Sequence, residues 1–392
     1  MLFPPDEAPQ HRASRYMTVK HRTLFATAVL SLCVVALFVS RAQVVTDTLP
    51  TELSDRAFWQ MVVDFSEADG IFRSDNFVSN ERTYQDVIPE LKRRALPNGV
   101  YLGVGPDQNF TYITALRPRM AFIIDIRRQN LIQHLLYKAI VEMSGDRGDF
   151  LARLFSRPRP AGLDESSSPK ALFDAYDGVA PSEALFETNL GEIENWLVDR
   201  HGFGLTPDDL RGLEYVYRAF LSEGSALRYS FPRQRLRTFP TYAELLMAVD
   251  QAGVNYSYVA SEQNFRTLRD VERRNLLVPI VGDFGGGKAI RAVGRYVSQH
   301  GGTVNYFYTS NVEQYLFQSD AFRRYYSNVA TLPLGEKSTF IRAYFDVGFV
   351  YPPGIITPDL HSVQLLDGIP GLLNAFGAGK IGTYDDAIER SK

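Results

Sequence analysis

The stretch Gly99-Val-Tyr-Leu-Gly-Val-Gly-Pro-Asp-Gln-Asn109 decides the fold prediction, together with Ala121-Phe-Ile-Ile-Asp-Ile126. The first stretch begins with a short apolar run typical of a buried strand, and Gly103 and Gly105 let the backbone turn tightly after it. The second stretch is another buried strand, and it ends in Asp125, roughly 20 residues after the glycines. This order of elements predicts a nucleotide-type pocket in a Rossmann-like sheet.

Composition limits the classes of function. The chain has 392 residues, of which 45% are hydrophobic, so it can bury a large core in one domain or two. The net charge of −3 gives no basic field, so we expect no nucleic-acid partner. Cys33 is the only cysteine, and the six histidines are scattered along the chain. We therefore expect no disulfide framework, thiol nucleophile or metal site in the folded body, residues 43–392.

The N-terminal segment predicts export. Residues Thr23 to Ser40 carry no charge and follow the basic run Lys20-His-Arg22, which is the pattern of a signal peptide. Cleavage after Ala42 would release the body, while an uncleaved hydrophobic helix over residues 23–40 would anchor it in the membrane. The flanking positive charges favour a cytoplasmic N-terminus. We therefore expect residues 43–392 to be periplasmic or on the extracytoplasmic face of the membrane.

The body is expected to be a doubly wound, mostly parallel α/β domain, with a helical insertion at about residues 148–235. Apolar periodicity and cap residues predict helices over residues 53–65, 83–95, 128–144, 189–200, 210–221, 241–252, 261–274 and 289–300. Thr206 and Ser261 are expected to be N-caps, and residues 156–169 are expected to form a loop. Residues 255–260 are expected to form a short strand or extended piece, and a late strand is expected over 339–345. The tail from His361 is expected to contain one helix and an acidic-capped end, Thr383-Tyr-Asp-Asp386. The polar clusters around Asn76, Asn80 and Glu81 are either a loop with a helix cap or a segment folded over the pocket.

A second glycine-rich turn follows another apolar strand, in Leu276-Leu-Val-Pro-Ile-Val-Gly-Asp-Phe-Gly-Gly-Gly-Lys288. Gly282, Gly287 and Lys288 satisfy the GxxxxGK pattern of a P-loop. The next residue is Ala289, where a P-loop needs Ser or Thr for Mg²⁺, and no strand resembling Walker B follows. Nucleotide hydrolysis therefore ranks third, after the two hypotheses that are given at the end of this subsection.

Polar residues at three strand ends predict one crevice. We expect Asp283 to lie at the carboxyl edge of a central parallel strand, where open α/β sheets bind ligands. The strand over residues 303–309 is followed by Ser310 and Asn311, which either line the same crevice as Asp125 and Asp283 or cap the next helix.

These elements resemble the class I S-adenosylmethionine-dependent methyltransferases over residues 99–126 and 277–315. Residues 104–109 resemble the glycine loop of that family, Asp125 its ribose-binding acid, and Gly282-Asp-Phe284 its fourth-strand acid near the transferable methyl group. Longer stretches, from YLGVGPDQNFTYI through FIIDIRRQN and VGDFGG to SNVEQYL, look like an uncharacterised bacterial family of exported or anchored proteins.

The methyltransferase resemblance implies a methyl transfer from S-adenosylmethionine to an unknown acceptor, with Asp283 orienting or deprotonating the acceptor. The residues that it places at the cofactor are Gly103, Gly105, Asp107, Asn109, Asp125, Ser310 and Asn311. S-adenosylmethionine is a cytoplasmic cofactor, however, and the body is expected outside the cytoplasm. The competing hypothesis is a non-catalytic exported protein that reuses the fold to bind a small molecule or a partner.

Overall fold

Six strands form one mixed sheet in the part of the chain that the computed structural model describes, residues 48–94, 99–230, 239–345 and 362–391. Their order in the sheet is β3-β2-β1-β4-β5-β6. The strands are β1 (Val100–Gly103), β2 (Met120–Asp125), β3 (Leu277–Val281), β4 (Val304–Ser310), β5 (Leu334–Phe345) and β6 (Ser362–Gly368). The five strands from β3 to β5 in this order run parallel, and β6 pairs antiparallel to β5.

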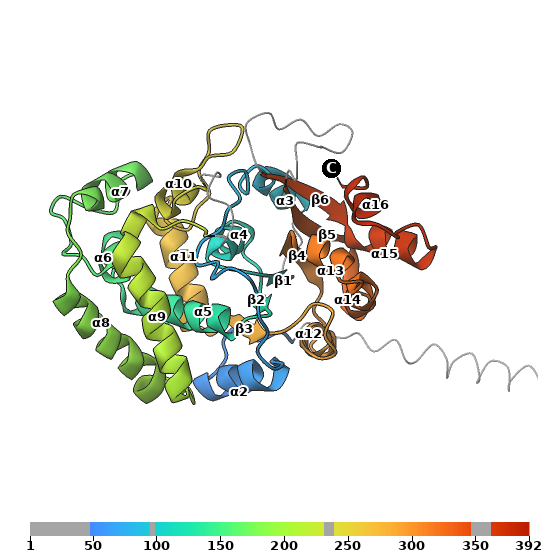
Figure 1. Cartoon of the computed structure of the whole chain (residues 1–392), viewed down its shortest axis with the longest axis horizontal. Coiled ribbons are helices and arrows are strands. Elements are labelled where there is room, and N and C mark those ends of the chain that lie inside the picture. Colours follow the sequence, from blue (N-terminus) through green and yellow to red (C-terminus); the bar gives the residue numbers. More distant parts are fainter. Residues whose placement is uncertain (1–47, 95–98, 231–238, 346–361, 392) are drawn as a thin grey trace, which may run out of the picture. The chain divides into compact units, whose positions relative to one another are not determined.

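The central strands are apolar because both of their faces are covered. Every residue of β1, β2 and β3 is buried, as expected for a parallel sheet between two layers of helices. Figure 1 shows helices α4–α11 on one side of the sheet and α12–α16 on the other. The architecture is therefore a mixed α/β fold with a mostly parallel sheet, as the sequence predicted.

Helices fill the connections between the strands. Before β2 lie α2 (Asp55–Phe65), α3 (Ile88–Arg94) and α4 (Gln108–Leu116). Between β2 and β3 lie α5 (Arg128–Met143), α6 (Arg147–Phe155), α7 (Pro169–Asp177), α8 (Glu183–Asn195), η1 (Trp196–Arg200), α9 (Pro207–Glu223), η2 (Gly224–Ala226), α10 (Tyr242–Met247) and α11 (Glu262–Arg273). After β3 lie α12 (Ala289–Gln299), α13 (Val312–Gln318), α14 (Phe322–Val329), α15 (Ile369–Gly377) and α16 (Tyr384–Ile388).

Helices occupy most of the connection between β2 and β3, from α5 to α11, and α5 itself packs against both strands. Cap residues position these helices: Thr206 and Asp209 form a capping box at the start of α9, and the Ser261 side chain accepts a hydrogen bond at the start of α11. Both N-termini were predicted at these residues.

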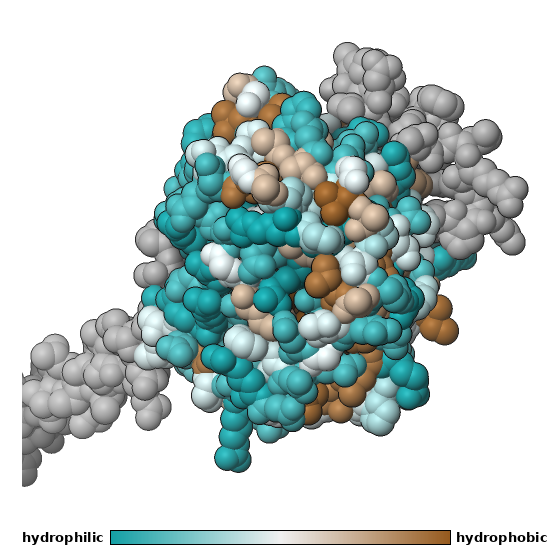
Figure 2. Space-filling model, turned by 90° about the vertical axis from the view of Figure 1, so that its left-hand side faces the viewer, coloured by the Kyte–Doolittle hydropathy of each residue, from teal (hydrophilic) through white to brown (hydrophobic). Residues whose placement is uncertain are grey.

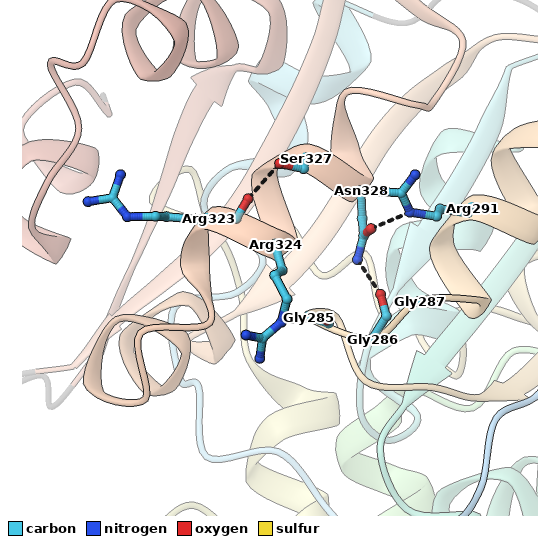
Figure 3. A pocket seen from close by; sticks show the side chains of 8 residues that line it. All are labelled: Gly285, Gly286, Gly287, Arg291, Arg323, Arg324, Ser327 and Asn328. Carbon is cyan, nitrogen blue, oxygen red and sulfur yellow. Dashed lines mark hydrogen bonds between the residues drawn. The ribbon is translucent and has the colours of Figure 1, made fainter.

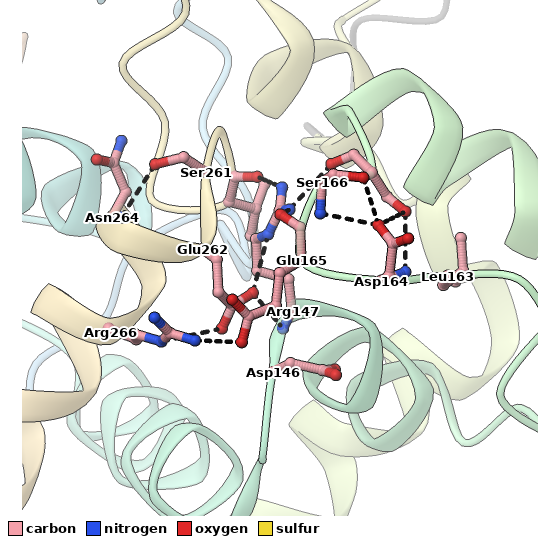
Figure 4. A network of polar contacts seen from close by, with 12 residues as sticks. Asp146, Arg147, Leu163, Asp164, Glu165, Ser166, Ser261, Glu262, Asn264 and Arg266 are labelled. Atoms are coloured by element: carbon pink, nitrogen blue, oxygen red, sulfur yellow. Dashed lines mark hydrogen bonds and ion pairs between the residues drawn. The ribbon is translucent and has the colours of Figure 1, made fainter.

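Arg147 organises the loop between α6 and α7 (Figure 4). Its side chain is almost fully buried and pairs with Glu262 of α11 at 3.2 Å. It also donates hydrogen bonds to the carbonyl oxygens of Val259, Glu165 and Ser167. A stretch that the sequence predicted as a loop is thereby held against α11, so Arg147 has a structural role. Figure 2 views the molecule from the side of the insertion, and this face is mainly hydrophilic with scattered apolar residues.

Several local predictions differ from the structure. The helix predicted over 83–95 begins at Ile88, and the helix predicted over 189–200 begins at Glu183. Residues 255–260 form no strand, since 255–257 have no regular secondary structure and 258–259 form a turn, and α10 ends at Met247, well before residue 252. The tail contains the strand β6 and the two helices α15 and α16, where the sequence predicted one helix. The strand was missed because its stability comes from pairing with β5, which no local pattern in β6 reveals.

The predicted hydrophobic helix over residues 23–40 lies outside the described residues, as does the rest of the predicted signal or anchor segment, residues 1–42. Among the residues that are described, no helix has the length and apolar character needed to cross a bilayer. The sequence-based expectation of a signal peptide or anchor therefore stays a prediction.

Candidate functional site

The order of the sheet reverses between β1 and β4, and open α/β sheets bind ligands at such a switch point. A glycine loop follows β1, Asp125 ends β2 and Ser310 ends β4, so these groups share one edge of the sheet, as predicted. Asp283 follows β3, which lies at the outer edge of the sheet and is separated from β1 by β2. Asp283 therefore does not end a central strand, and this expectation was wrong.

The glycine loop after β1 is fastened by Asn109. Gly105 has a φ of +78°, a conformation that favours glycine. The Asn109 amide donates to the carbonyl oxygen of Val104 at 2.9 Å, and its oxygen accepts from the Tyr101 hydroxyl at 2.8 Å. A Cβ on Gly103 would lie 1.9 Å from this Asn109 oxygen. Asn109, expected at the cofactor, thus has its polar groups engaged inside the protein.

Asp107 is a buried carboxyl group without a cationic partner among the described residues. Its side chain accepts a hydrogen bond from the Tyr258 hydroxyl at 2.8 Å, and that hydroxyl lies 2.6 Å from the hydroxyl of Tyr242. Burial raises the pKa of Asp107 to about 7, although the hydrogen bond from Tyr258 opposes this shift. Asp107 therefore titrates near neutral pH.

Asp125, expected to hold a ribose, is paired with Arg127. One carboxylate oxygen accepts from the backbone and Nε of Arg127, both at 3.0 Å, and the other accepts from Nη2 at 2.9 Å. Both side chains are 6% exposed. Burial disfavours the charged guanidinium, but the Asp125 carboxylate outweighs it and raises the pKa of Arg127. The bidentate pair engages both oxygens that a ribose would need.

Residues 66–81, which we name the strap, cross the carboxyl edge of the sheet. The backbone N–H groups of Glu67 and Gly70 donate to the carbonyl oxygens of Val281 and Ile126, each at 2.8 Å. Further along the strap, the carbonyl oxygen of Ser74 accepts from Arg127 Nη1 at 3.2 Å. The strap thus contacts the ends of both β2 and β3. The sequence left open whether this segment was a loop or a cover, and it lies over the strand ends.

Glu81, at the end of the strap, fills the switch point. One of its oxygens accepts from the hydroxyls of Tyr308 and Ser310, at 2.8 and 2.5 Å. The other accepts from the amides of Gln108 and Gln364, at 2.7 and 2.5 Å. The carboxyl group is 1% exposed, and burial raises its pKa although all four hydrogen bonds oppose the shift. Glu81 therefore links β4, α4 and β6, and it engages the Ser310 hydroxyl expected at a cofactor. The neighbouring Asn311 is partly exposed.

Glu67, near the start of the strap, occupies the loop that resembles a P-loop. One carboxylate oxygen accepts from the backbone N–H groups of Lys288 and Ala289, at 2.6 and 3.0 Å, and the other accepts from that of Asp283 at 3.0 Å. The N–H groups of Lys288 and Ala289 begin α12, where a P-loop would bind phosphate. An internal carboxylate therefore takes the position of the phosphate.

Three buried polar atoms near the glycine loop lack partners among the described residues: Gln108 Oε1, Asn130 Nδ2 and His134 Nδ1. His134 Nε2 lies 2.9 Å from the carbonyl oxygen of Gly105, to which it must donate, so Nδ1 is unprotonated. Burial lowers the pKa of His134 to about 4, which keeps the ring neutral. His134 is packed rather than exposed, and Asn130 lies one turn before it on α5.

A family model described as a domain of unknown function, DUF7790, matches residues 76–162 and 213–365. The chain belongs to the DUF7790 family. No curated protein sequence matches it. In this DUF7790 chain the matched stretches contain the glycine loop, Asp125, Arg127 and Glu81. The unmatched interval between them contains α7, α8 and η1.

An open cavity of about 610 Å³ lies beside the second glycine loop (Figure 3). It is lined by Gly285, Gly286, Gly287, Arg291, Arg323, Arg324, Ser327 and Asn328. The three arginines make no ion pair with any carboxylate of the described residues, and no acidic residue lines the cavity. The sequence singled out this loop through its GxxxxGK pattern, but it gave no sign that α14 would bring arginines to it.

A second cavity, of about 440 Å³, lies between α2 and η1. His201 bridges two of its carboxylates, with Nδ1 2.7 Å from Asp55 and Nε2 2.7 Å from Glu142. Lys138 also pairs with Glu142, at 2.6 Å. Within the described ranges, no group of three or more His, Cys, Asp or Glu residues could hold a metal ion. The His201 cluster is therefore an ion-pair network that ties α2 to the helical insertion.

Proposed function

We propose that this DUF7790 chain is a non-catalytic small-molecule-binding protein built on a Rossmann-like fold. The observation that carries the proposal is the internal pairing of the strand-end groups. Arg127 holds Asp125, Glu81 holds Ser310, and Glu67 caps the loop after β3. A methyltransferase would need these groups to face its cofactor. Fold alone does not imply the reaction, so the pairing outweighs the resemblance.

Methyl transfer from S-adenosylmethionine is the second candidate, and two observations favour it. The switch point between β1 and β4 lies beside the glycine loop and Asp125, as the resemblance implies. The unpartnered atoms of Gln108, Asn130 and His134 also lie near that loop, where they would suit a polar ligand under the strap. Asp283 is a weaker candidate for the acceptor side, because it follows the edge strand β3.

A ligand panel on the full-length chain separates the two candidates. Thermal unfolding is measured with S-adenosylmethionine, S-adenosylhomocysteine and nucleotides, for the wild type, Asp125→Ala and the exposed control Asp64→Ala. If the proposal is correct, neither S-adenosylmethionine nor S-adenosylhomocysteine stabilises the protein. The loss of thermal stability caused by Asp125→Ala is then the same with and without these compounds. Saturable stabilisation by S-adenosylmethionine that is lost in Asp125→Ala and kept in Asp64→Ala would overturn it.

We also propose that the body is exported or held at the extracytoplasmic face of the membrane through residues 23–40. The charge-free run and its basic flank support this proposal. A topology reporter fused after Lys392 tests it, because the reporter should be active only in the extracytoplasmic compartment. Activity confined to the cytoplasm would refute export and would strengthen the methyltransferase candidate.

A further inference from the structure

We infer that the cavity beside the second glycine loop binds the phosphomonoester group of its ligand. We name this cavity, lined by residues 285–287, 291, 323, 324, 327 and 328, the arginine cavity. The inference rests on the proposed binding function and names the chemical class of the ligand. It concerns a surface of the molecule that none of the strand-end residues lines.

Two arginines in the arginine cavity are anchored at one end only. Arg324 donates through Nε to the carbonyl oxygen of Gly285 at 3.1 Å. Arg291 donates through Nε to the Asn328 side-chain oxygen at 2.7 Å. The terminal nitrogens of both guanidinium groups have no hydrogen bond to the described residues. Each arginine is therefore held in place while its forked end is left for an anion (Figure 3).

Asn328 is the residue that joins the two walls of the arginine cavity. It is 2% exposed, and its amide donates to the carbonyl oxygens of Phe284 and Gly286, at 2.8 and 2.6 Å. The side chain of this α14 residue thus fixes both the glycine loop and Arg291 of α12. Asn328 acts on a ligand through Arg291, so it is a positioning residue.

Three arginines line the arginine cavity, and none of them pairs with a carboxylate of the described residues. Some arginines elsewhere do pair: Arg218 lies 2.6 Å from Glu183 and 3.0 Å from Glu214. No acidic residue lines the cavity to repel an anion there.

The geometry favours a phosphate over a carboxylate as the bound anion. It also favours side chains over backbone N–H groups as the donors to that anion. Glu67 already engages the N–H groups of Lys288 and Ala289, so the loop cannot cradle a phosphate as a P-loop does. The guanidinium groups remain, and a phosphomonoester offers three oxygens and up to two charges to a forked guanidinium end. A volume of about 610 Å³ is in the range of small-molecule sites.

Calorimetric titration of the full-length chain tests the inference. The probes are inorganic phosphate and glycerol phosphate, acetate as the carboxylate control, and phosphatidylcholine vesicles with and without phosphatidic acid. We expect saturable binding of the phosphate probes and weaker binding of acetate. Binding to phosphatidic acid vesicles alone would still support a phosphomonoester and would assign its source to a lipid headgroup.

The variants are chosen to remove one guanidinium at a time. Arg291→Gln and Arg324→Gln should each weaken phosphate binding about tenfold or more. Arg295→Gln is the matched control, because Arg295 is an exposed arginine of α12 that does not line the cavity. Asn328→Leu should weaken binding without a change of charge, and thermal unfolding of each variant verifies that it is folded.

Two results would overturn the inference. The first is that no phosphate probe binds. The second is that Arg291→Gln and Arg324→Gln bind the phosphate probes as tightly as the control Arg295→Gln. Neither result would decide the proposed function, which the S-adenosylmethionine panel tests separately. Conversely, phosphate binding together with S-adenosylmethionine binding would support the arginine cavity and refute the non-catalytic proposal.

Discussion

The carboxylate of Glu67 accepts a hydrogen bond from the backbone N–H of Lys288 at 2.6 Å, at the position where a P-loop holds phosphate. The Lys288 side chain donates back to the strap, to the carbonyl oxygen of Ser66 at 2.6 Å. A pattern that suggests nucleotide binding in the sequence is therefore a docking point for the strap in the structure. The negative carboxylate also suits the positive end of α12.

Replacing Glu67 by Gln should lower the free energy of unfolding by about 1 kcal/mol. The amide loses the negative charge at the start of α12, and its NH₂ group faces a backbone N–H instead of accepting from it. Urea unfolding measures the change. Asp64→Asn is the control, since Asp64 is an exposed carboxylate that bonds only to Gln60 among the described residues. Equal effects of the two substitutions would contradict the role of Glu67.

Asp107 should make the protein less stable as the pH rises from about 4 to about 7. Burial raises the pKa of Asp107 from 3.8 to about 7, so in this range the folded state binds a proton that the unfolded state releases. Asp107→Asn should remove this slope and stabilise the protein above pH 7, by roughly a few kcal/mol at most. Chemical unfolding at several pH values measures it, with Asp174→Asn as an exposed control. An unchanged slope in Asp107→Asn would contradict the prediction.

Local patterns in the sequence were sufficient for the glycine loop, Asp125 and most strands and helices. Buried strands such as β2 consist of apolar residues because both faces are covered, and this leaves a clear signal in the sequence. The caps at Thr206 and Ser261 were predictable for the same reason, since a cap and its helix are neighbours in the chain.

The partners of the strand-end residues were not predictable, because they depend on sheet order and on distant contacts. Every parallel strand ending in an acid looks alike in sequence, so Asp283 was assigned to a central strand although β3 is at the edge. Glu81 meets Gln364 across 283 residues, and Glu67 meets Lys288 across 221. A local pattern of apolar and polar residues does not reveal contacts between residues so far apart in the chain.

His201 should stabilise the protein at low pH and lose this effect as the pH rises. Burial disfavours its charged form, but the hydrogen bond and the charge of Glu142 outweigh burial and raise the pKa of His201. Its contribution is therefore complete below the unfolded pKa of 6.5, and it disappears as the pH passes the higher folded pKa.

The test compares thermal unfolding of the wild type and His201→Gln between pH 5 and 9. The stability difference should be largest at the acid end of this range and should shrink toward the alkaline end. His300→Gln serves as the control, because His300 lies 2.8 Å from the backbone oxygen of Tyr296 and has no carboxylate partner among the described residues. A constant difference across the range would refute the predicted role of His201.

The Asp125–Arg127 pair gives the last prediction, because removing one partner leaves a buried charge. Arg127→Met should lower the free energy of unfolding by about 3–5 kcal/mol, since the Asp125 carboxylate is then buried without a counter-charge. The double variant Asp125→Leu/Arg127→Met should be more stable than Arg127→Met alone, because it buries no unpaired charge. Urea unfolding of both variants measures the difference. If the double variant is instead the less stable of the two, groups other than Arg127 stabilise the buried Asp125 carboxylate. The pairing that carries the proposed function is then not the dominant interaction at the end of β2.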